Sequence, residues 1–332
     1  MKNLIKAFLV VIIIYFLAEY NVINALEISK VFDNYNSFSF IFLLMLVNIF
    51  VGAFKWWILL RSEKYSISYY NAYLIYSTGV FFNIFMPGGA GGDITKSLYL
   101  FSYVKKSQRT LAVFTIIIDR IIGLHALLFV IFVISCFLSD QIFHITEIKI
   151  LLYCTTSLMI FSIPAIFFII RYSEKISHYL KDKNYSEGRI LETIFKILKA
   201  LIVYRNRKFI ILKCWLISAF NHILLLSCFY LTAISIDINI FTFFEAAFIG
   251  GLSLIANIIP LTPGGIGIGE GFFDFLSNYF HYSNTLAFGS IFFITIRVLF
   301  SFVSLVGSIS FIALKKPKKL YAISQKKKNL DD

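Results

Sequence analysis

Residues Asn257-Ile-Ile-Pro260-Leu-Thr-Pro263-Gly264-Gly265-Ile-Gly267-Ile-Gly269-Glu270 interrupt a long apolar region of the chain. Proline lacks the N–H that a helix needs and glycine loosens the backbone, so a membrane helix cannot continue through this stretch. Broken backbone at membrane depth persists only where protein or a water-filled cavity covers it. A carboxylate, Glu270, follows the break, so we expect a working site here rather than a linker.

A second stretch upstream has the same order of residue types: Asn83-Ile-Phe-Met-Pro87-Gly88-Gly89-Ala-Gly91-Gly92-Asp93. In both copies an asparagine comes first, followed by proline, a glycine-rich turn and an acid. Each acid also precedes an arginine in an apolar run by 27 residues: Asp93 precedes Arg120, and Glu270 precedes Arg297. Two copies with the same spacing indicate a repeated structural unit.

The composition is that of a polytopic membrane protein. The 332 residues are 59% hydrophobic, and the mean hydropathy is +0.81, which is too apolar for a soluble domain. The net charge of +13 can suggest nucleic acid. However, Lys and Arg concentrate in short connecting segments, as they do in the cytoplasmic loops of membrane proteins. We therefore expect no nucleic-acid partner.

Cysteine and histidine give no sign of a metal or cofactor site. The four cysteines lie in apolar runs without a CxxC pair, and the five histidines include no HxxxH pair. Such cysteines are typical of small core residues rather than of disulfides. We expect neither a metal nor a cofactor.

Hydropathy and the positive-inside rule predict six full spans, at 4–23, 38–60, 110–138, 148–170, 210–234 and 285–314. The segments 66–104 and 241–280 hold the two breaks and are predicted as re-entrant hairpins. Basic residues flank the first hairpin, which enters from the cytoplasm, whereas the second has none and enters from outside. Both termini are then cytoplasmic. The Lys55-Trp56-Trp57 run and Arg61 are predicted as an interfacial anchor.

The predicted fold class is thus an all-α polytopic membrane protein built as an inverted-topology repeat. One transmembrane domain covers 1–314, with repeat halves at about 38–138 and 210–314 and a basic cytoplasmic loop at 171–209. The loop forms either an amphipathic helix on anionic lipid or a solvated connector. The tail 315–332 is basic, cytoplasmic and mostly disordered. Inverted repeats place their site at the bilayer midplane, where the broken helices meet.

Charged residues of the two repeats are the candidates for a substrate site. A half-helix that starts after each glycine-rich turn directs N–H groups and the positive end of its dipole into the membrane. An arginine at a helix centre costs about 2.5–3.5 kcal/mol and is kept only where something compensates it. The candidate substrate-binding residues are Asp93, Lys96, Asp119, Arg120, Glu270 and Arg297.

Two interpretations of these residues are compatible with each other. The charges form intramembrane salt bridges that fix the hairpins to neighbouring spans, or they hold an anionic headgroup such as a lipid phosphate. Asp119 is expected to orient its neighbour Arg120. Lys96 either reaches a phosphate or extends to the interface. Asn83 and Asn257 are expected to bind freed backbone groups, while the prolines and glycines shape the turns.

Four elements together resemble the lysylphosphatidylglycerol synthase transmembrane region, a family that is also described as flippase-like. They are Pro87 to Asp93, the Asp119-Arg120 pair, Pro263 to Glu270, and Arg297. The resemblance covers nearly the whole chain, and Pro-Gly-Gly-x-Gly-x-x-Glu is its most specific part. One departure is Lys96, because the family's first motif usually runs acid-x-x-Arg. Lysine keeps the charge but loses bidentate phosphate geometry.

The resemblance implies a lipid flippase of the plasma (inner) membrane. It would translocate an anionic or zwitterionic phospholipid, or a polyprenyl-phosphate-linked lipid, through a midplane site. The resemblance also implies that the chain keeps the translocating half of two-part family members and lacks their soluble aminoacyl-transferase half. Membrane lipids are the expected partners, and small residues such as Gly250, Gly251 and Gly307 suit packing within or between protomers.

Alternatives of other classes follow from the same residues. The main alternative is a non-transporting partner of a glycosyltransferase or lipid-modifying enzyme. No Ser-His-Asp set is visible, and Gly88 to Gly92 lacks the Lys-Ser/Thr ending of a phosphate-binding P-loop, so we expect no enzyme. Three carboxylates keep an enzyme acting on a polyprenyl phosphate within the bilayer as the third possibility.

Overall fold

The computed structural model describes residues 34–85, 91–142, 144–182, 204, 207–235, 241–258, 267–280 and 288–314. These residues form helices and connecting turns, with no strand among them. Several predictions fall outside the described residues. They concern the first span at 4–23, most of the basic loop, the tail, and the turn residues Pro87, Gly88, Gly89, Pro260, Pro263, Gly264 and Gly265.

Four helices within the described ranges are long and apolar enough to cross a membrane. They are α3 (Tyr35–Ser62), α6 (Arg109–Cys136), α10 (Lys208–Ser235) and α13 (Phe288–Ala313). Each coincides, within a few residues, with one of the predicted spans. The chain is therefore an all-helical, multi-pass membrane protein in its described parts.

The helix α8 (Thr146–Asp182) contains the predicted span at 148–170 and continues beyond it. Pro164 lies inside α8 and does not end it. The basic loop predicted to begin at residue 171 is therefore helical as far as Asp182. The physical reason is that residues 171–182 contain neither proline nor glycine, so nothing in them stops the helix.

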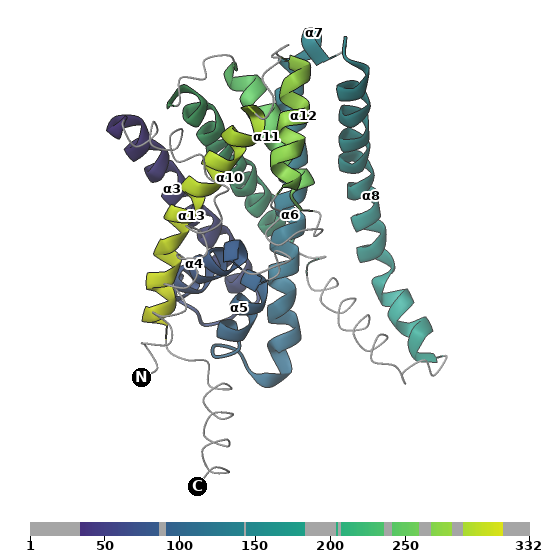
Figure 1. Ribbon diagram of the computed structural model, residues 1–332. Coiled ribbons are helices and arrows are strands. Elements are labelled where there is room, and N and C mark those ends of the chain that lie inside the picture. Colours follow the sequence, from purple (N-terminus) through teal and green to yellow (C-terminus); the bar gives the residue numbers. More distant parts are fainter. Residues whose placement is uncertain are drawn as a thin grey trace.

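Two pairs of shorter helices lie between the long ones. α4 (Tyr69–Phe85) and α5 (Gly91–Leu100) follow α3, whereas α11 (Phe243–Ala256) and α12 (Ile268–Phe280) follow α10. The order long, short, short, long therefore occurs twice in the chain. Figure 1 shows α4 and α5 toward the lower end of the long helices, and α11 and α12 toward the upper end. Each glycine-rich stretch of the sequence extends from the interval between two short helices to the start of the second.

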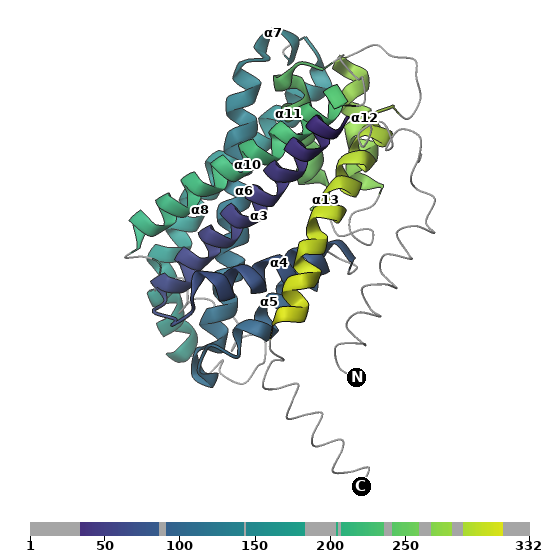
Figure 2. The ribbon, with the colours of Figure 1, turned by 90° about the vertical axis from the view of Figure 1, so that its left-hand side faces the viewer.

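The helices of the two halves pack against one another. α3 and α10 lie side by side and run in opposite directions (Figure 2). The short helix α4 packs against α13, and the short helix α11 packs against α6. Each short pair therefore contacts the last long helix of the other half.

Two glycines allow these cross-half contacts, but they do so differently. A Cβ on Gly307 of α13 would collide with the carbonyl oxygen of Ser77 on α4, so two backbones meet there. A Cβ on Gly251 of α11 would lie 2.7 Å from Cγ1 of Ile131 on α6, which is a side chain. The contact between α4 and α13 is also polar, because Ser77 Oγ donates to Ser310 Oγ at 2.8 Å.

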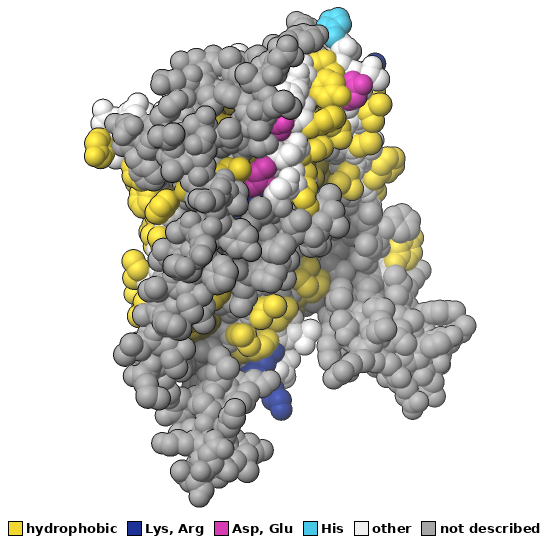
Figure 3. All heavy atoms as spheres, viewed as in Figure 1, with side chains coloured by type: hydrophobic (Ala, Val, Ile, Leu, Met, Phe, Trp, Pro, Cys, Tyr) yellow, Lys and Arg dark blue, Asp and Glu magenta, His cyan; other side chains and the backbone are white. Residues whose placement is uncertain are grey.

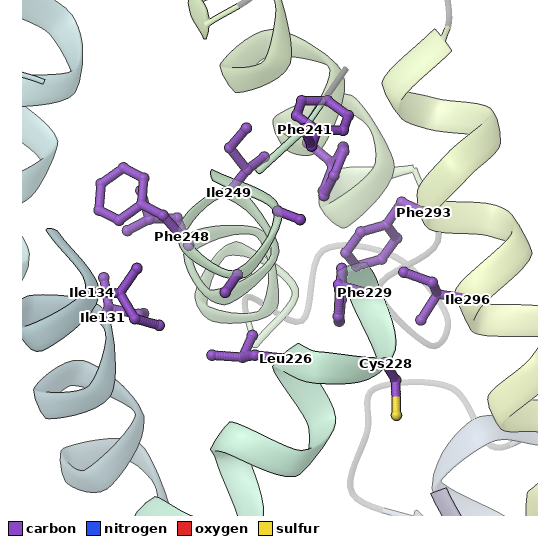
Figure 4. Packing of buried hydrophobic residues seen from close by; sticks show 14 of the residues in the cluster. Ile131, Ile134, Leu226, Cys228, Phe229, Phe241, Phe248, Ile249, Phe293 and Ile296 are labelled. Carbon is purple, nitrogen blue, oxygen red and sulfur yellow. The ribbon is translucent and has the colours of Figure 1, made fainter. Parts of the chain in front are cut away.

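Aromatic rings fill the core around the second short pair. Phe229 of α10 lies close to Phe293 and Ile296 of α13 (Figure 4), with 5.8 Å between the centroids of the two rings. Phe273 of α12 packs on Phe292 at 4.8 Å. On the molecular face in Figure 3, the described side chains are mainly hydrophobic. Such a surface suits contact with lipid rather than with water.

Candidate functional site: two ion pairs on the short helices

The first ion pair joins the beginning of α5 to the middle of α6. Asp93 lies in the first turn of α5, and its Oδ2 accepts a hydrogen bond from Nε of Arg120. Lys96 follows one turn later, with its Nζ 4.0 Å from Oδ1 of the same carboxylate. Asp93 is therefore shared between two cations.

The side chain of Lys96 is buried and held by its neighbours. Its Nζ lies 4.1 Å from the ring centroid of Tyr76 and 5.9 Å from that of Trp56, positions in which aromatic rings attract a cation. A Cβ on Gly79 of α4 would come within 2.7 Å of Lys96 Cε, so only glycine leaves room for this side chain. The predicted alternative that Lys96 extends to the interface is therefore wrong.

The second ion pair joins α12 to α13. Glu270 lies in the first turn of α12, and its Oε1 is 2.7 Å from Nε of Arg297. Nη2 of Arg297 also donates to Oδ1 of Asn257, at 3.0 Å, just after the end of α11. The other carboxylate oxygen of Glu270 accepts from the N–H of Gly267 at 2.8 Å. One guanidinium thus connects α13 to both members of the short pair.

The two asparagines occupy corresponding places but bind different groups. Oδ1 of Asn83 accepts from the backbone N–H of Gly92 at 2.9 Å, which is the role predicted for it. Asn257 was predicted to do the same, and this stays a prediction because the turn that follows it lies outside the described residues. Its Oδ1 accepts from the Arg297 side chain. The hydrogen bond from the Arg297 guanidinium to the amide oxygen of Asn257 is charge-assisted, and such a bond is stronger than one donated by a neutral backbone N–H.

The sequence suggested that Asp119 orients Arg120, but the structure pairs Asp119 with Lys55 instead. Its Oδ1 lies 3.0 Å from Nζ of Lys55 on α3, and this amine also donates to Ser218 Oγ on α10 at 3.3 Å. Adjacent residues on a helix point in different directions, so the side chains of Asp119 and Arg120 do not face each other. Lys55 and Trp56 are both buried, so the predicted interfacial anchor is wrong for these two residues.

A further ion pair lies outside the predicted site, beyond the end of α3. The buried carboxylate of Glu63 accepts from Nη1 of Arg207, which precedes α10, and the same nitrogen donates to Ser62 Oγ at 3.1 Å. Burial raises the pKa of Glu63 above its ordinary value, and the nearby Arg207 reduces this effect without reversing it. This pair ties α3 to the start of α10.

The structure therefore divides the predicted site residues into separate groups. One contains Asp93, Lys96 and Arg120, and another contains Glu270, Arg297 and Asn257. The described turn glycines lie at the starts of the second short helices: Gly91, Gly92, Gly267 and Gly269. Among the described residues, no group of His, Cys, Asp or Glu is arranged to hold a metal ion. Both groups place a cation and a carboxylate among apolar helices, an arrangement suited to binding ionic headgroups.

Comparison with known proteins identifies the family. A family model described as the lysylphosphatidylglycerol synthase TM region matches residues 3–307. The UPF0104 membrane protein MJ1595 of Methanocaldococcus jannaschii is 23% identical over 274 residues, which cover 79% of this chain and 81% of the relative. No solved structure matches the sequence. The chain therefore belongs to the family of the lysylphosphatidylglycerol synthase transmembrane region.

Proposed function

We propose that this protein moves a phosphate-bearing lipid across the plasma membrane. The substrate class is an anionic or zwitterionic phospholipid or a polyprenyl-phosphate-linked lipid. The headgroup would pass between the two short-helix pairs while the apolar chains stay in the bilayer. Family membership, the multi-pass membrane class and the two ion pairs support the proposal.

The observation that carries the proposal is the matching position of the two ion pairs. In each half, an acid in the first turn of the second short helix binds an arginine of the next long helix. The short pairs lie toward opposite ends of the long helices (Figure 1). We interpret this as an inverted-topology repeat with six spans, two re-entrant hairpins and cytoplasmic termini. Transporters with such repeats bind their substrates near the bilayer midplane, at the broken helices.

We propose transport rather than catalysis because of how the carboxylates are paired. Asp93, Asp119 and Glu270 each have a cation within 4.0 Å. Carboxylates held in this way serve as counter-ions for arginine and lysine. A catalytic acid or base instead needs a pKa close to the working pH and an open position beside the substrate.

Lipid translocation by the purified protein in reconstituted vesicles tests the proposal. Vesicles carry a phosphatidylglycerol with a fluorescent headgroup label, and a membrane-impermeant reductant bleaches the outer leaflet. We expect the protein to make the inner-leaflet label accessible. Two double variants should slow this exchange: Asp93→Ala with Arg120→Ala, and Glu270→Ala with Arg297→Ala. Gly271→Ala is the matched control, because a Cβ at Gly271 meets nothing within 4 Å.

Two outcomes would count against the proposal. Parent-like exchange by both double variants would remove the assigned role of the ion pairs. No exchange by the parent protein, together with co-purification of a glycosyltransferase or lipid-modifying enzyme, would favour a non-transporting partner instead.

A further inference from the structure

Lys55 of α3 and Asp119 of α6 form an ion pair in which both side chains are almost fully buried, at 7% and 9% exposed. We infer that Asp119 is a proton-binding residue, which is ionised while Lys55 lies beside it and takes up a proton when α6 separates from α3. This proton site lies outside the two ion pairs that carry the proposed transport. It rests on the proposed function only where proton uptake is linked to lipid movement.

The pair lies well inside the hydrocarbon region of the spanning helices. Asp119 is ten residues from the first residue of α6, and Ser218 is ten residues from the first residue of α10. At the rise of an α-helix this is about 15 Å along each axis, half of the roughly 30 Å thickness of a hydrocarbon core. Because ions are costly at that depth, each charge of the pair depends on the other.

The ammonium group of Lys55 contacts three oxygen atoms. Its Nζ lies 3.0 Å from Asp119 Oδ1, and it donates to Ser218 Oγ at 3.3 Å and to the backbone oxygen of Asp119 at 3.4 Å. Two of these three acceptors are neutral, so among them the carboxylate is the group that balances the positive charge. Separation of Lys55 from Asp119 therefore leaves both charges without this compensation.

The groups around the pair are engaged with other partners. The titratable side chains that interact electrostatically with it are Tyr76 of α4, Lys96 of α5, and Cys214 and His222 of α10. Tyrosine and cysteine cannot supply a positive charge. Nε2 of His222 donates to the carbonyl oxygen of Gly123 at 3.0 Å, since a carbonyl can only accept. Lys96 and Arg120 both face Asp93.

A movement that draws α6 away from α3 must break this pair, and the two residues differ in what they can do next. Lys55 is seven residues from the last residue of α3, about 10 Å along the helix, so its long side chain can extend toward the interface. Asp119 has a short side chain and stays in the membrane interior. A buried carboxylate without a cation favours its neutral form, because burial penalises the charge.

The chemical step is a protonation. A proton from water forms an O–H bond with a carboxylate oxygen of Asp119, while Lys55 keeps its ammonium protons. When α6 returns to α3, the nearby ammonium favours the carboxylate again, and Asp119 releases the proton. Proton binding and separation of the two helices therefore favour each other, as binding of any ligand to one of two conformations does.

The contact that opens includes helices of both halves. α3 lies beside α10 (Figure 2), and Ser218 of α10 accepts from the same ammonium group. Under the proposed function, a headgroup that passes between the short-helix pairs requires the halves to shift relative to each other. Uptake of a proton by Asp119 removes one attraction that opposes such a shift. Lower pH should therefore speed lipid exchange.

Infrared difference spectroscopy of the purified full chain in lipid nanodiscs tests the proton site without requiring transport. On acidification, the parent should gain the C=O stretching band of a protonated carboxylic acid that Asp119→Asn lacks. Lys55→Met should show this band already at neutral pH, because Asp119 has lost its cation. Combining Lys55→Met with Asp119→Asn should remove it. A pH-indicator dye reports whether the proton comes from the medium.

The parent and Asp119→Asn decide the test even if Lys55→Met does not fold, because asparagine is close in size to protonated aspartic acid and still offers Lys55 an oxygen. Identical spectral changes in these two proteins, or a folded Lys55→Met without the band, would overturn the inference. A band in the parent without uptake from the medium would do so too, since Lys55 would then have passed its own proton to Asp119. Glu63→Gln, which changes a carboxyl group outside the cluster, is the control and should keep the Asp119 band.

Lipid exchange in reconstituted vesicles tests the link to transport. The parent rate should rise as the pH falls, by up to about tenfold per pH unit, the limit for one proton. Asp119→Asn should lose this dependence, whereas Glu63→Gln should keep it. Exchange with the same pH dependence in the parent and in Asp119→Asn would defeat the inference alone. The Asp119 band without any lipid exchange by the parent would defeat the proposed function alone.

Discussion

Lys55 of α3 and Asp119 of α6 form a buried ion pair with 3.0 Å between Nζ and Oδ1, although 64 residues separate them in the chain. Neither side chain is more than 9% exposed. Because Lys55 also donates to Ser218 Oγ, this pair links α3, α6 and α10 at one point. The three helices come from both halves of the chain, so the pair belongs to their shared core.

Removing only one charge of the Lys55–Asp119 pair should lower the free energy of unfolding. Lys55→Met leaves the Asp119 carboxylate buried without its cation, and a loss of about 3–5 kcal/mol is expected for such a change. Lys55→Met combined with Asp119→Leu removes both charges and should cost clearly less. Thermal unfolding of the solubilised protein, followed by the loss of the monodisperse peak in size-exclusion chromatography, measures both. Equal losses in the single and double variants would mean that the pairing itself contributes nothing.

The close contact between Gly307 and Ser77 predicts a strong effect of a single methyl group. Gly307→Ala places a Cβ against the Ser77 carbonyl oxygen, so α4 and α13 must move apart. We expect destabilisation of about 1–3 kcal/mol, typical of overpacking. Gly271→Ala is the control, since its Cβ meets nothing and alanine favours a helix. A parent-like melting temperature for Gly307→Ala would contradict this contact.

The guanidinium of Arg297 should not be replaceable by an ammonium group. Arg297 uses Nε for Glu270 and Nη2 for Asn257, whereas Arg297→Lys offers one nitrogen that cannot occupy both places. A loss of about 1.5–3 kcal/mol is expected, the range for a hydrogen bond to a charged group. Asn257→Ala removes only one of the two bonds and should cost less. If Arg297→Lys melts like the parent, the double contact is unimportant for stability.

The raised pKa of Glu63 predicts a pH dependence of stability. Since burial raises this pKa above its ordinary value of 4.5, the folded protein binds the proton more tightly than the unfolded chain does. The free energy of unfolding should therefore fall as the pH rises from 4.5 through the pKa of the folded state.

The Glu63→Gln variant isolates this contribution. It should remove the fall in the free energy of unfolding over this pH range. The loss of a charged partner for Arg207 should lower the free energy of unfolding by the same amount at every pH. Melting temperatures of parent and variant across this pH range provide the measurement. Parallel curves would show that the carboxyl group does not titrate on unfolding.

The sequence predicted the two acid–arginine pairs because the same order of residues and the same spacing occur twice in the chain. A helix start after a glycine-rich turn places the acid in the first turn, and in both halves the arginine 27 residues later lies beside it. Four of the predicted spans were located within a few residues for a related reason. A long apolar run has few alternatives to a membrane helix.

Local sequence patterns could not identify the partner of Asp119. Its cation, Lys55, comes from a helix 64 residues away, and sequence gives no distance between the two helices. The adjacent tryptophans favoured an interfacial position for Lys55, whereas the structure buries it. One local signal was available, namely that adjacent helical residues diverge, which already separates Asp119 from Arg120. The contact of Asn257 Oδ1 with Arg297 was likewise not predicted, because Arg297 lies on another helix.

The backbone contact between Ser77 and Gly307 has a mechanical consequence. Main-chain atoms in direct contact cannot make room by changing a rotamer, so α4 and α13 cannot come closer together at this point. The counterpart on the other side, where Gly251 meets Cγ1 and Cδ1 of Ile131, involves a side chain that can change its rotamer. Of these two contacts between the halves, the one between α4 and α13 is therefore the less compressible.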